Sequence, residues 1–227
     1  MPLIDPELIV FDLDGTLAAT VPDIAAALNH ALAAVGLPAY PEAAVAEMIG
    51  GGEETFLRRA LGPDHQDLYP EVRRRYLDYY AAHLVEATRL YPGVQETLAA
   101  LTPRKLAVLS NKLAVLTQGI VTQLGLGPFF QAVRGGDSYG VLKPDPRGLM
   151  ALIRDLKARP ERTLMVGDKP ADVLAGKGAG TATVAVTYGY GEPARLAAAG
   201  PEALIGEFSQ LLELVGGAPG GNAPHND

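Results

Sequence analysis

The sequence predicts an α/β fold: a Rossmann-like, doubly wound parallel sheet with an α-helical domain inserted into it. Short apolar runs alternate with helical patterns between Leu106 and Val186, and this alternation is typical of parallel strands joined by helices. A helical stretch of about 70 residues separates the first apolar run from the second, which is far longer than an ordinary crossover. The sheet is therefore expected to be interrupted after its first strand.

The composition is that of a globular protein. The chain has 227 residues, of which 48% are hydrophobic and 20% charged, with a formal net charge of −7; such values argue against a disordered chain. At about 150 residues per domain, the length suggests one domain with a smaller addition. The chain contains no cysteine, which excludes disulfides, thiolate zinc sites and cysteine nucleophiles. The acidic balance disfavours broad nucleic-acid binding.

No targeting or membrane segment is expected. Met1 to Glu7 lacks a basic region and contains two prolines, unlike a secretory signal. The longest apolar-rich stretch, Ile24 to Leu37, is too short to span a bilayer. These features favour a cytoplasmic protein without a membrane partner, and the sequence leaves open whether it is a monomer or a homodimer.

The first strand and the first helix have recognisable boundaries. Leu8 to Leu13 is an apolar run that ends in acidic residues, which predicts a buried strand. Thr20 precedes Pro22, which predicts a helix capped by the threonine, and Gly36 lies past its end. The apolar positions of this helix share one face: Ile24, Leu28, Leu32 and Val35. Further helices are expected at Pro41 to Met48, Glu53 to Leu61 and Pro70 to Glu86.

The remaining elements alternate in type. Strands are predicted at Leu106 to Leu109, Ala132 to Arg134, Thr163 to Val166 and Ala182 to Val186. Helices are predicted at Leu113 to Leu124, Pro146 to Leu156 and Ala171 to Ala179. The chain then divides into an α/β core of residues 1–17 and 88–215, a helical cap domain of residues 18–87, and a Gly/Pro-rich tail of residues 216–227 that is expected to be disordered. The inserted helices are a candidate lid over an active site.

Polar residues follow each of the predicted strands. Ligands of open parallel sheets bind beyond the carboxyl ends of the strands, so these residues are expected to converge. The four groups are, in chain order, Asp12-Leu13-Asp14-Gly15-Thr16, Ser110-Asn111-Lys112, Lys143-Pro144-Asp145-Pro146 and Gly167-Asp168-Lys169-Pro170-Ala171-Asp172.

The residue types in these groups indicate metal-assisted phosphoryl transfer. Asp12, Asp14 and Asp168 would crowd negative charge into one place, which is costly without a cation. Oxygen ligands of this kind suit Mg²⁺. A carboxylate can also act as a covalent nucleophile through an aspartyl-phosphate. Phosphoryl transfer itself is catalysed mainly by positioning and by positive charge.

Each residue also has a plain structural interpretation. Asp12 and Asp14 could be turn residues, because Asp-Gly is a common turn pair. Ser110 could cap a helix, Asp172 could favour a first helical turn, and Lys143 could be solvated. The rigid Lys-Pro-Asp-Pro loop can instead aim Lys143 inward. The presence of all four groups in order favours the chemical interpretation.

The four groups together resemble the motifs of the haloacid dehalogenase superfamily, most of whose members are phosphatases. The resemblance extends over nearly the whole chain, up to about Gly191. It implies that Asp12 is the nucleophile. It also implies that Asp14 protonates the leaving alcohol and later activates water, while its backbone carbonyl binds the metal.

The resemblance assigns the other residues as well. Asp12, Asp14 and Asp168 would hold Mg²⁺, Lys143 would balance charge, and Asp172 would orient Lys143 or a metal-bound water. Substrate phosphate would be bound near Gly15, Thr16, Ser110 and Asn111, with Gly15 permitting close backbone approach.

Several segments are similar to phosphoglycolate phosphatases with a helical cap. They are FDLDGTL with TVPDIAAALN, Gly50-Gly51-Gly52 before Leu57-Arg58-Arg59-Ala60-Leu61, Tyr91-Pro92-Gly93-Val94, Ser110-Asn111-Lys112, Gly135-Gly136-Asp137-Ser138 and Tyr188-Gly189-Tyr190-Gly191. Ala18-Ala19 departs from that pattern, which usually has an acidic residue at the second position. Asp14 argues against a haloacid dehalogenase, and Thr16 favours hydrolysis over phosphosugar mutation.

Four basic residues have open or weak assignments. Arg58, or else Arg59, could pair with a substrate carboxylate, and the alternative for each is a solvent-facing arginine. Lys112 is expected to be solvated. Lys169 stands where phosphatases of this type usually carry serine, and it either touches substrate or is inert.

The sequence thus predicts a Mg²⁺-dependent phosphomonoesterase that acts on a small phosphorylated acid or sugar through an aspartyl-phosphate. The first substrate to test is 2-phosphoglycolate. Alternatives of the same fold are a pyrophosphatase, a nucleotidase and a phosphosugar phosphatase or mutase; from another class, the chain could be a non-catalytic protein that binds a phosphorylated ligand. Nucleic acid is not an expected partner.

Overall fold

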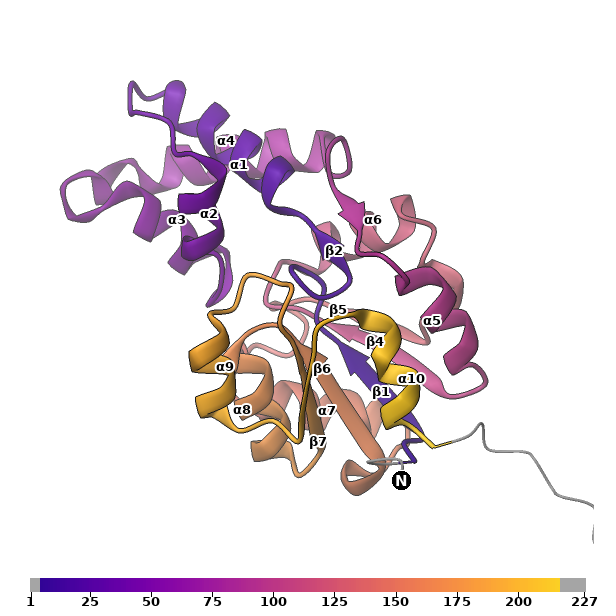
Figure 1. Ribbon diagram of the computed structural model, residues 1–227. Coiled ribbons are helices and arrows are strands. Elements are labelled where there is room, and N and C mark those ends of the chain that lie inside the picture. The colour runs from indigo at the N-terminus through magenta and orange to yellow at the C-terminus, as the bar shows by residue number, and fades with distance from the viewer. Residues whose placement is uncertain (1–4, 217–227) are drawn as a thin grey trace, which may run out of the picture.

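A parallel six-stranded sheet forms the centre of the molecule, with strand order β5-β4-β1-β6-β7-β8 (Figure 1). The computed structural model describes residues 5–216, so the predicted disordered tail, apart from Gly216, lies outside the described residues. The strands of the sheet are β1 (Leu8–Phe11), β4 (Lys105–Leu109), β5 (Ala132–Arg134), β6 (Thr163–Gly167), β7 (Ala182–Val186) and β8 (Ala203–Ile205).

Helices cover both faces of this sheet. Successive side chains of each strand point to opposite faces, so each strand presents apolar residues to both layers of helices. Ile9 and Phe11 of β1 belong to the larger apolar cluster, whereas Leu8 and Val10 belong to the cluster on the other face. The helices of the core are α5 (Val94–Leu101), α6 (Ala114–Gln123), α7 (Arg147–Asp155), α8 (Pro170–Ala179), α9 (Pro193–Ala199) and α10 (Leu211–Leu214). The predicted doubly wound α/β fold is confirmed.

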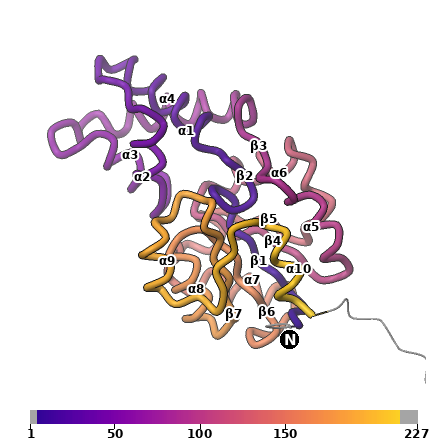
Figure 2. The backbone as a smooth tube through the Cα atoms, viewed as in Figure 1, coloured from indigo at the N-terminus to yellow at the C-terminus, as the bar shows by residue number. Residues whose placement is uncertain are grey.

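Four helices between β1 and α5 in the chain pack together above the sheet (Figure 1). This helical insert consists of α1 (Val21–Ala33), α2 (Glu42–Met48), α3 (Gly52–Leu61) and α4 (Tyr69–Ala82). A two-stranded antiparallel ribbon of β2 (Ala18–Ala19) and β3 (Arg89–Leu90) joins the insert to the core, as Figure 2 shows. Chain entry and chain exit of the insert therefore lie side by side.

A buried carboxylate fastens these two connections. Asp23, in the first turn of α1, accepts hydrogen bonds from the backbone N–H groups of Glu86, Ala87 and Thr88, at 2.8–3.1 Å. The sequence predicts a helix as far as Glu86, but α4 ends at Ala82, because the following backbone donors are used by Asp23 instead of by a helical turn.

Other short elements have weak sequence signals. The sequence pattern did not predict β2, β3, α5, β8, α9 or α10, nor the short 3₁₀ turns at Pro63–Leu68, Gly127–Phe129, Pro160–Arg162 and Phe208–Gln210. Most of these elements have two to four residues, which are too few for a periodic pattern, whereas α5 and α9, with eight and seven residues, were missed. None of the helices in the described part of the chain is long and apolar enough to cross a membrane.

Candidate active site

A cavity of about 320 Å³ lies between the helical insert and the carboxyl ends of the strands. The core supplies the charged floor of this cavity, and the insert supplies Ile49, Phe56, Arg59 and Tyr76 as well as the loop Gly50–Gly52. The predicted residues that line it are Asp12, Asp14, Ser110, Asn111, Lys143 and Asp172. Most of the predicted site is therefore brought to one place.

Lys143 and two aspartates form the most tightly connected part of this floor. The Lys143 ammonium lies 3.0 Å from Asp12 Oδ1 and 2.6 Å from Asp172 Oδ1, and it donates to the carbonyl oxygen of Leu109 at 2.6 Å. Its side chain is only 4% exposed. Burial acts to lower the pKa of Lys143, but the carboxylates of Asp12 and Asp172 outweigh burial and raise it above its ordinary value. Lys143 is thus a permanent cation beside Asp12.

Asn111 holds the backbone of Lys143 in place. Its side-chain amide donates to the Lys143 carbonyl oxygen, and its carbonyl oxygen accepts from the Lys143 N–H, both at 2.8 Å. The resemblance placed Asn111 on substrate phosphate. In the structure both polar atoms of the side chain face the Lys143 backbone, so the residue positions the lysine.

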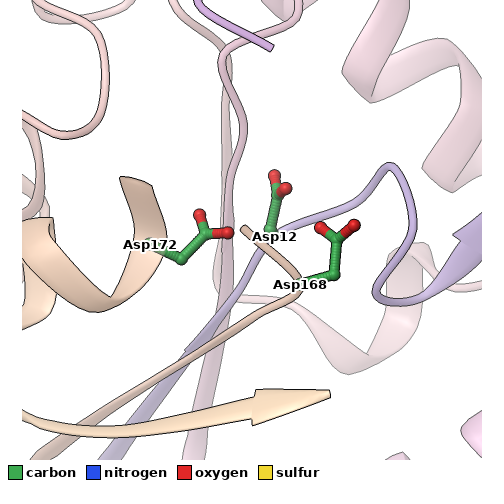
Figure 3. A group of neighbouring side chains, drawn as sticks. All are labelled: Asp12, Asp168 and Asp172. Atoms are coloured by element: carbon green, nitrogen blue, oxygen red, sulfur yellow. The ribbon is translucent and has the colours of Figure 1, made fainter. Parts of the chain in front are cut away.

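Three buried carboxylates lie next to one another: Asp12 after β1, Asp168 after β6 and Asp172 on α8 (Figure 3). One oxygen of each lies within 4.8 Å of the others. Burial, then the charges of Asp12 and Asp172, raise the pKa of Asp168 well above its ordinary value. Burial also raises the pKa of Asp172, to about 6, against the opposing effect of Lys143.

This donor set fits a small divalent cation. Asp12 Oδ1 is buried and accepts no hydrogen bond from the described residues, although the Lys143 ammonium is near. An all-oxygen cluster of this size is the kind that Mg²⁺ occupies. The cluster includes Asp172, which was expected beside Lys143, while the predicted metal contact of Asp14 is through its backbone carbonyl and stays a prediction.

The Asp14 carboxylate is not part of that cluster and has other partners. Its Oδ1 accepts a hydrogen bond of 2.6 Å from the Thr20 hydroxyl and lies 3.2 Å from the Lys112 ammonium. The prediction that Thr20 caps its helix with its side chain is therefore wrong. The first N–H groups of α1, those of Thr20 and Val21, donate instead to the Tyr190 hydroxyl, at 2.7 and 3.2 Å.

Gly15 and Thr16 support Asp168 rather than line the cavity. Gly15 has φ +83°, and a Cβ atom there would lie 2.3 Å from Asp168 Oδ2. Thr16 is fully buried, and its hydroxyl donates to Asp168 Oδ1 at 3.4 Å. The Tyr190 N–H donates to Asp168 Oδ2 at 2.7 Å. Thr16 and Tyr190 thus hold the carboxylate, and the missing side chain of Gly15 leaves room for it.

The segment after β4 differs from its expected arrangement. Ser110 does not cap the next helix; its hydroxyl accepts from the Lys112 N–H at 3.3 Å, while the Ala114 N–H at the start of α6 donates to Asp137 at 2.7 Å. The expectation that Lys112 is solvated is wrong, because its side chain is 7% exposed and faces Asp14.

The structure distinguishes the two adjacent arginines of the insert. Arg58 lies 2.8 Å from Glu54 and 4.1 Å from the ring centre of Tyr69, and it lines a neighbouring cavity and not this one. Arg59 lines the cavity and donates to the carbonyl oxygens of Met48 and Gly50. The prediction favoured Arg58, whereas the arginine that can meet a ligand in this cavity is Arg59.

Lys169 also lines the cavity. Its ammonium donates to the Tyr190 carbonyl oxygen at 3.0 Å. The sequence analysis assigned no role to Tyr190, although it lies in the quoted segment Tyr188-Gly189-Tyr190-Gly191. A tyrosine between glycines was the available signal, because flanking glycines allow close backbone approach.

Known proteins are similar to this chain in sequence and in architecture. The sequence profile of the haloacid dehalogenase-like hydrolases matches residues 9–186. A protein from Vibrio parahaemolyticus named phosphoglycolate phosphatase is 36% identical over 220 residues, which cover 93% of this chain and 96% of the relative. A protein of the same name from Vibrio cholerae is 38% identical over 218 residues, covering 92% and 96%.

A solved structure agrees with these relatives. It is described as a predicted phosphoglycolate phosphatase from Haemophilus somnus, is 34% identical, and superposes with a TM-score of 0.86 over 94% of this chain and 99% of that chain. The profile match covers more than half of the chain and includes Asp12, Lys143 and Asp168. The chain is thus a member of the haloacid dehalogenase-like hydrolase family.

Proposed function

We propose that this protein is a Mg²⁺-dependent phosphomonoesterase that forms an aspartyl-phosphate on Asp12. The observation that carries the proposal is the environment of this carboxylate. It lies at the floor of the cavity, 3.0 Å from the Lys143 ammonium and within the cluster of Asp168 and Asp172. A carboxylate flanked by a cation and a candidate metal site can approach a phosphate group in spite of its own charge.

The proposed reaction has two balanced steps. In the first, an oxygen of Asp12 attacks phosphorus, the bond from phosphorus to the leaving oxygen breaks, and Asp14 gives that oxygen its proton. In the second, water gives a proton to Asp14 and attacks phosphorus, and the Asp12–phosphate bond breaks. The products are an alcohol and inorganic phosphate, and both aspartates return to their starting states.

The remaining core residues support this chemistry. Lys143 counters the negative charge on Asp12 and on the phosphoryl oxygens, and the Ser110 hydroxyl, which lines the cavity, can donate to one of those oxygens. Mg²⁺ held by Asp12 and Asp168 would supply the main electrostatic stabilisation of the transferring phosphoryl group. Asp172 is paired with Lys143 at 2.6 Å and would orient it.

The substrate that the chain best supports is 2-phosphoglycolate. Relatives at 36–38% identity over nearly the whole chain are named phosphoglycolate phosphatase. In addition to the floor lysines, Arg59, Lys169 and Arg195 line the cavity, together with the carboxylates Glu47 and Glu53, so cations are available to a second anionic group of a small substrate. A carboxylate is such a group.

We also propose that residues 18–87 act as a cap over a core of residues 1–17 and 88–215. The ribbon of β2 and β3 and the bonds of Asp23 support this division, because they bring both connections to one narrow hinge. A cytoplasmic location and the oligomeric state stay predictions from the sequence.

A phosphate-release screen tests the proposed function. The purified chain with Mg²⁺ is assayed on 2-phosphoglycolate, phosphosugars, nucleotides and pyrophosphate, and kcat/KM values are compared because specificity is their ratio. We expect the highest value for 2-phosphoglycolate and loss of turnover with EDTA. A higher kcat/KM for pyrophosphate, a nucleotide or a phosphosugar would make that compound the preferred substrate in place of 2-phosphoglycolate. A ligand-dependent thermal shift without any phosphate release would indicate a non-catalytic binder and overturn the proposal.

A further inference from the structure

Lys112 is a buried cation of the cavity that the reaction described above does not use. It follows β4, two residues beyond Ser110, and its side chain is 7% exposed. Placing a lysine in such a position costs conformational entropy and desolvation. Its contacts therefore indicate what it stabilises.

Those contacts join the core to the helical insert. The Lys112 ammonium lies 3.2 Å from Asp14 Oδ1, donates to the Tyr80 hydroxyl at 3.1 Å and lies 4.7 Å from the centre of the Tyr80 ring. Tyr80 belongs to α4 and is fully buried. Burial raises the pKa of Tyr80 well above its ordinary value, so its hydroxyl stays neutral and accepts from the ammonium.

The same contacts give the two carboxylate oxygens of Asp14 different surroundings. Oδ1 is close to both Lys112 and the Thr20 hydroxyl. Among residues 5–216, Oδ1 accepts the one side-chain hydrogen bond made to this carboxylate and is its nearest oxygen to Lys112, whereas Oδ2 accepts no hydrogen bond. A proton carried by Asp14 is therefore favoured on Oδ2, because Oδ1 already faces two donors.

We propose that Lys112 is a positioning residue that fixes the Asp14 carboxyl group through Oδ1, leaves Oδ2 to exchange the proton with the leaving oxygen, and links this arrangement to the helical insert through Tyr80. This inference rests on the proposed function, since it presumes that Asp14 is the acid and base. Lys112 acts through Asp14 and is not itself placed on the reacting atoms.

The leaving group provides a readout that a merely structural role would not move. An alkoxide needs a proton as it leaves, whereas 4-nitrophenolate is a weak base that leaves without much help. General acid catalysis contributes roughly 10²–10⁴-fold. A misplaced Asp14 should therefore slow an alkyl phosphate far more than 4-nitrophenyl phosphate.

The experiment compares kcat for the best alkyl phosphate of the screen with kcat for 4-nitrophenyl phosphate, both with Mg²⁺. For Lys112→Met we expect a loss of at least about tenfold on the alkyl ester and of less than about threefold on the aryl ester. Lys112→Arg keeps the cation and should restore at least part of the alkyl rate. Lys177→Met is the matched control, because Lys177 lies on α8 and its ammonium donates to the Ala199 carbonyl oxygen on the exposed surface.

Equal losses on both esters would overturn the inference, and so would a rise in KM with kcat unchanged, which would make Lys112 a binding residue. If Lys112→Met does not fold, Lys112→Gln is judged by the same ratio. Tyr80→Phe tests the link to the insert: a selective loss of about twofold or more on the alkyl ester supports it, and an unchanged ratio overturns it. If the wild-type chain hydrolyses neither ester, the proposed function itself fails.

Discussion

The core and the helical insert contribute to one cavity, but they hold their cavity residues in different ways. In the core, Lys143 has three close buried partners, and Asp168 accepts from buried Thr16 and partly buried Tyr190. In the insert, Arg59 donates to two backbone carbonyls at the exposed surface. The comparison suggests that the core fixes the chemistry and that the insert sets the choice of substrate.

The largest effect is expected from the core. Asp12→Asn keeps the size of the side chain but removes the attacking carboxylate. We expect kcat to fall by at least about 10³-fold on every substrate, because loss of a covalent nucleophile costs this much or more. Phosphate release measures the effect, and an unchanged unfolding temperature serves as the control for folding. Full turnover by this variant would remove Asp12 as the nucleophile.

A smaller effect is expected where the core supports its carboxylates. In Gly15→Ala the new Cβ atom would lie 2.3 Å from Asp168 Oδ2, at a backbone φ of +83°. We expect a loss of about 1–3 kcal/mol in the free energy of unfolding, together with weaker Mg²⁺ binding. Denaturant unfolding and metal titration by calorimetry measure the two. Gly36→Ala is the matched control for a positive φ, with no atom near its Cβ. Equal losses in both variants would exclude crowding at Asp168.

The insert should affect substrate choice and leave the chemistry intact. We expect Arg59→Met to raise KM for 2-phosphoglycolate about tenfold, since hydrogen bonds to charged groups contribute roughly 1.5–3 kcal/mol, with kcat for 4-nitrophenyl phosphate little changed. Arg58→Met, the same substitution one position earlier, should change KM by less than about twofold because Arg58 lies against Tyr69 and Glu54. If Arg58→Met raised KM more than Arg59→Met, Arg58 would be the residue that binds substrate. If neither variant changed KM, these arginines would not set the choice of substrate.

The smallest effect is on the pH dependence of stability, and it tests the buried carboxyl groups of the core. Burial raises the pKa of Asp168, and that of Asp172 to about 6. A carboxyl group whose pKa is higher in the folded state stabilises the fold at low pH, and this stabilisation is lost as pH rises through the folded-state pKa. The metal-free protein should therefore unfold a few degrees lower at about pH 7.5 than at about pH 5.

Mg²⁺ provides the control for this pH effect. A cation in the carboxylate cluster favours the ionised forms, so added Mg²⁺ should raise the unfolding temperature more at about pH 7.5 than at about pH 5. Scanning calorimetry measures both. An unfolding temperature of the metal-free protein that rises between these pH values would contradict the predicted role of the buried carboxyl groups.

The sequence predicted which residues converge at the edge of the sheet, but it did not predict the partners of their neighbours. Strand ends place Asp12, Ser110 and Asp168 at one edge of the sheet whatever the detailed packing, so their convergence followed from topology. The partners of Thr20 and Lys112 depend on how the insert lies on the core. Thr20 was expected to cap a helix and Lys112 to be solvated, and tertiary contacts with Asp14 and Tyr80 overrode both local preferences.

The same reasoning applies to the arginines and to the metal cluster. Arg58 and Arg59 are adjacent, and only the direction of α3 decides which one meets the cavity. The Asp14 carboxylate accepts from the Thr20 hydroxyl, whereas Asp172 on α8 joins Asp12 and Asp168 in the carboxylate cluster. Residue type and spacing do not contain this information.

Tyr190 contacts both the candidate metal site and the start of the helical insert. Its backbone N–H binds Asp168, and its hydroxyl receives the first N–H groups of α1. Coupling between two sites is reciprocal, so any factor by which cation binding favours one position of the insert is also the factor by which that position strengthens cation binding. Under the proposed function, a substrate that favours a closed insert would also strengthen cation binding, and product release would weaken it.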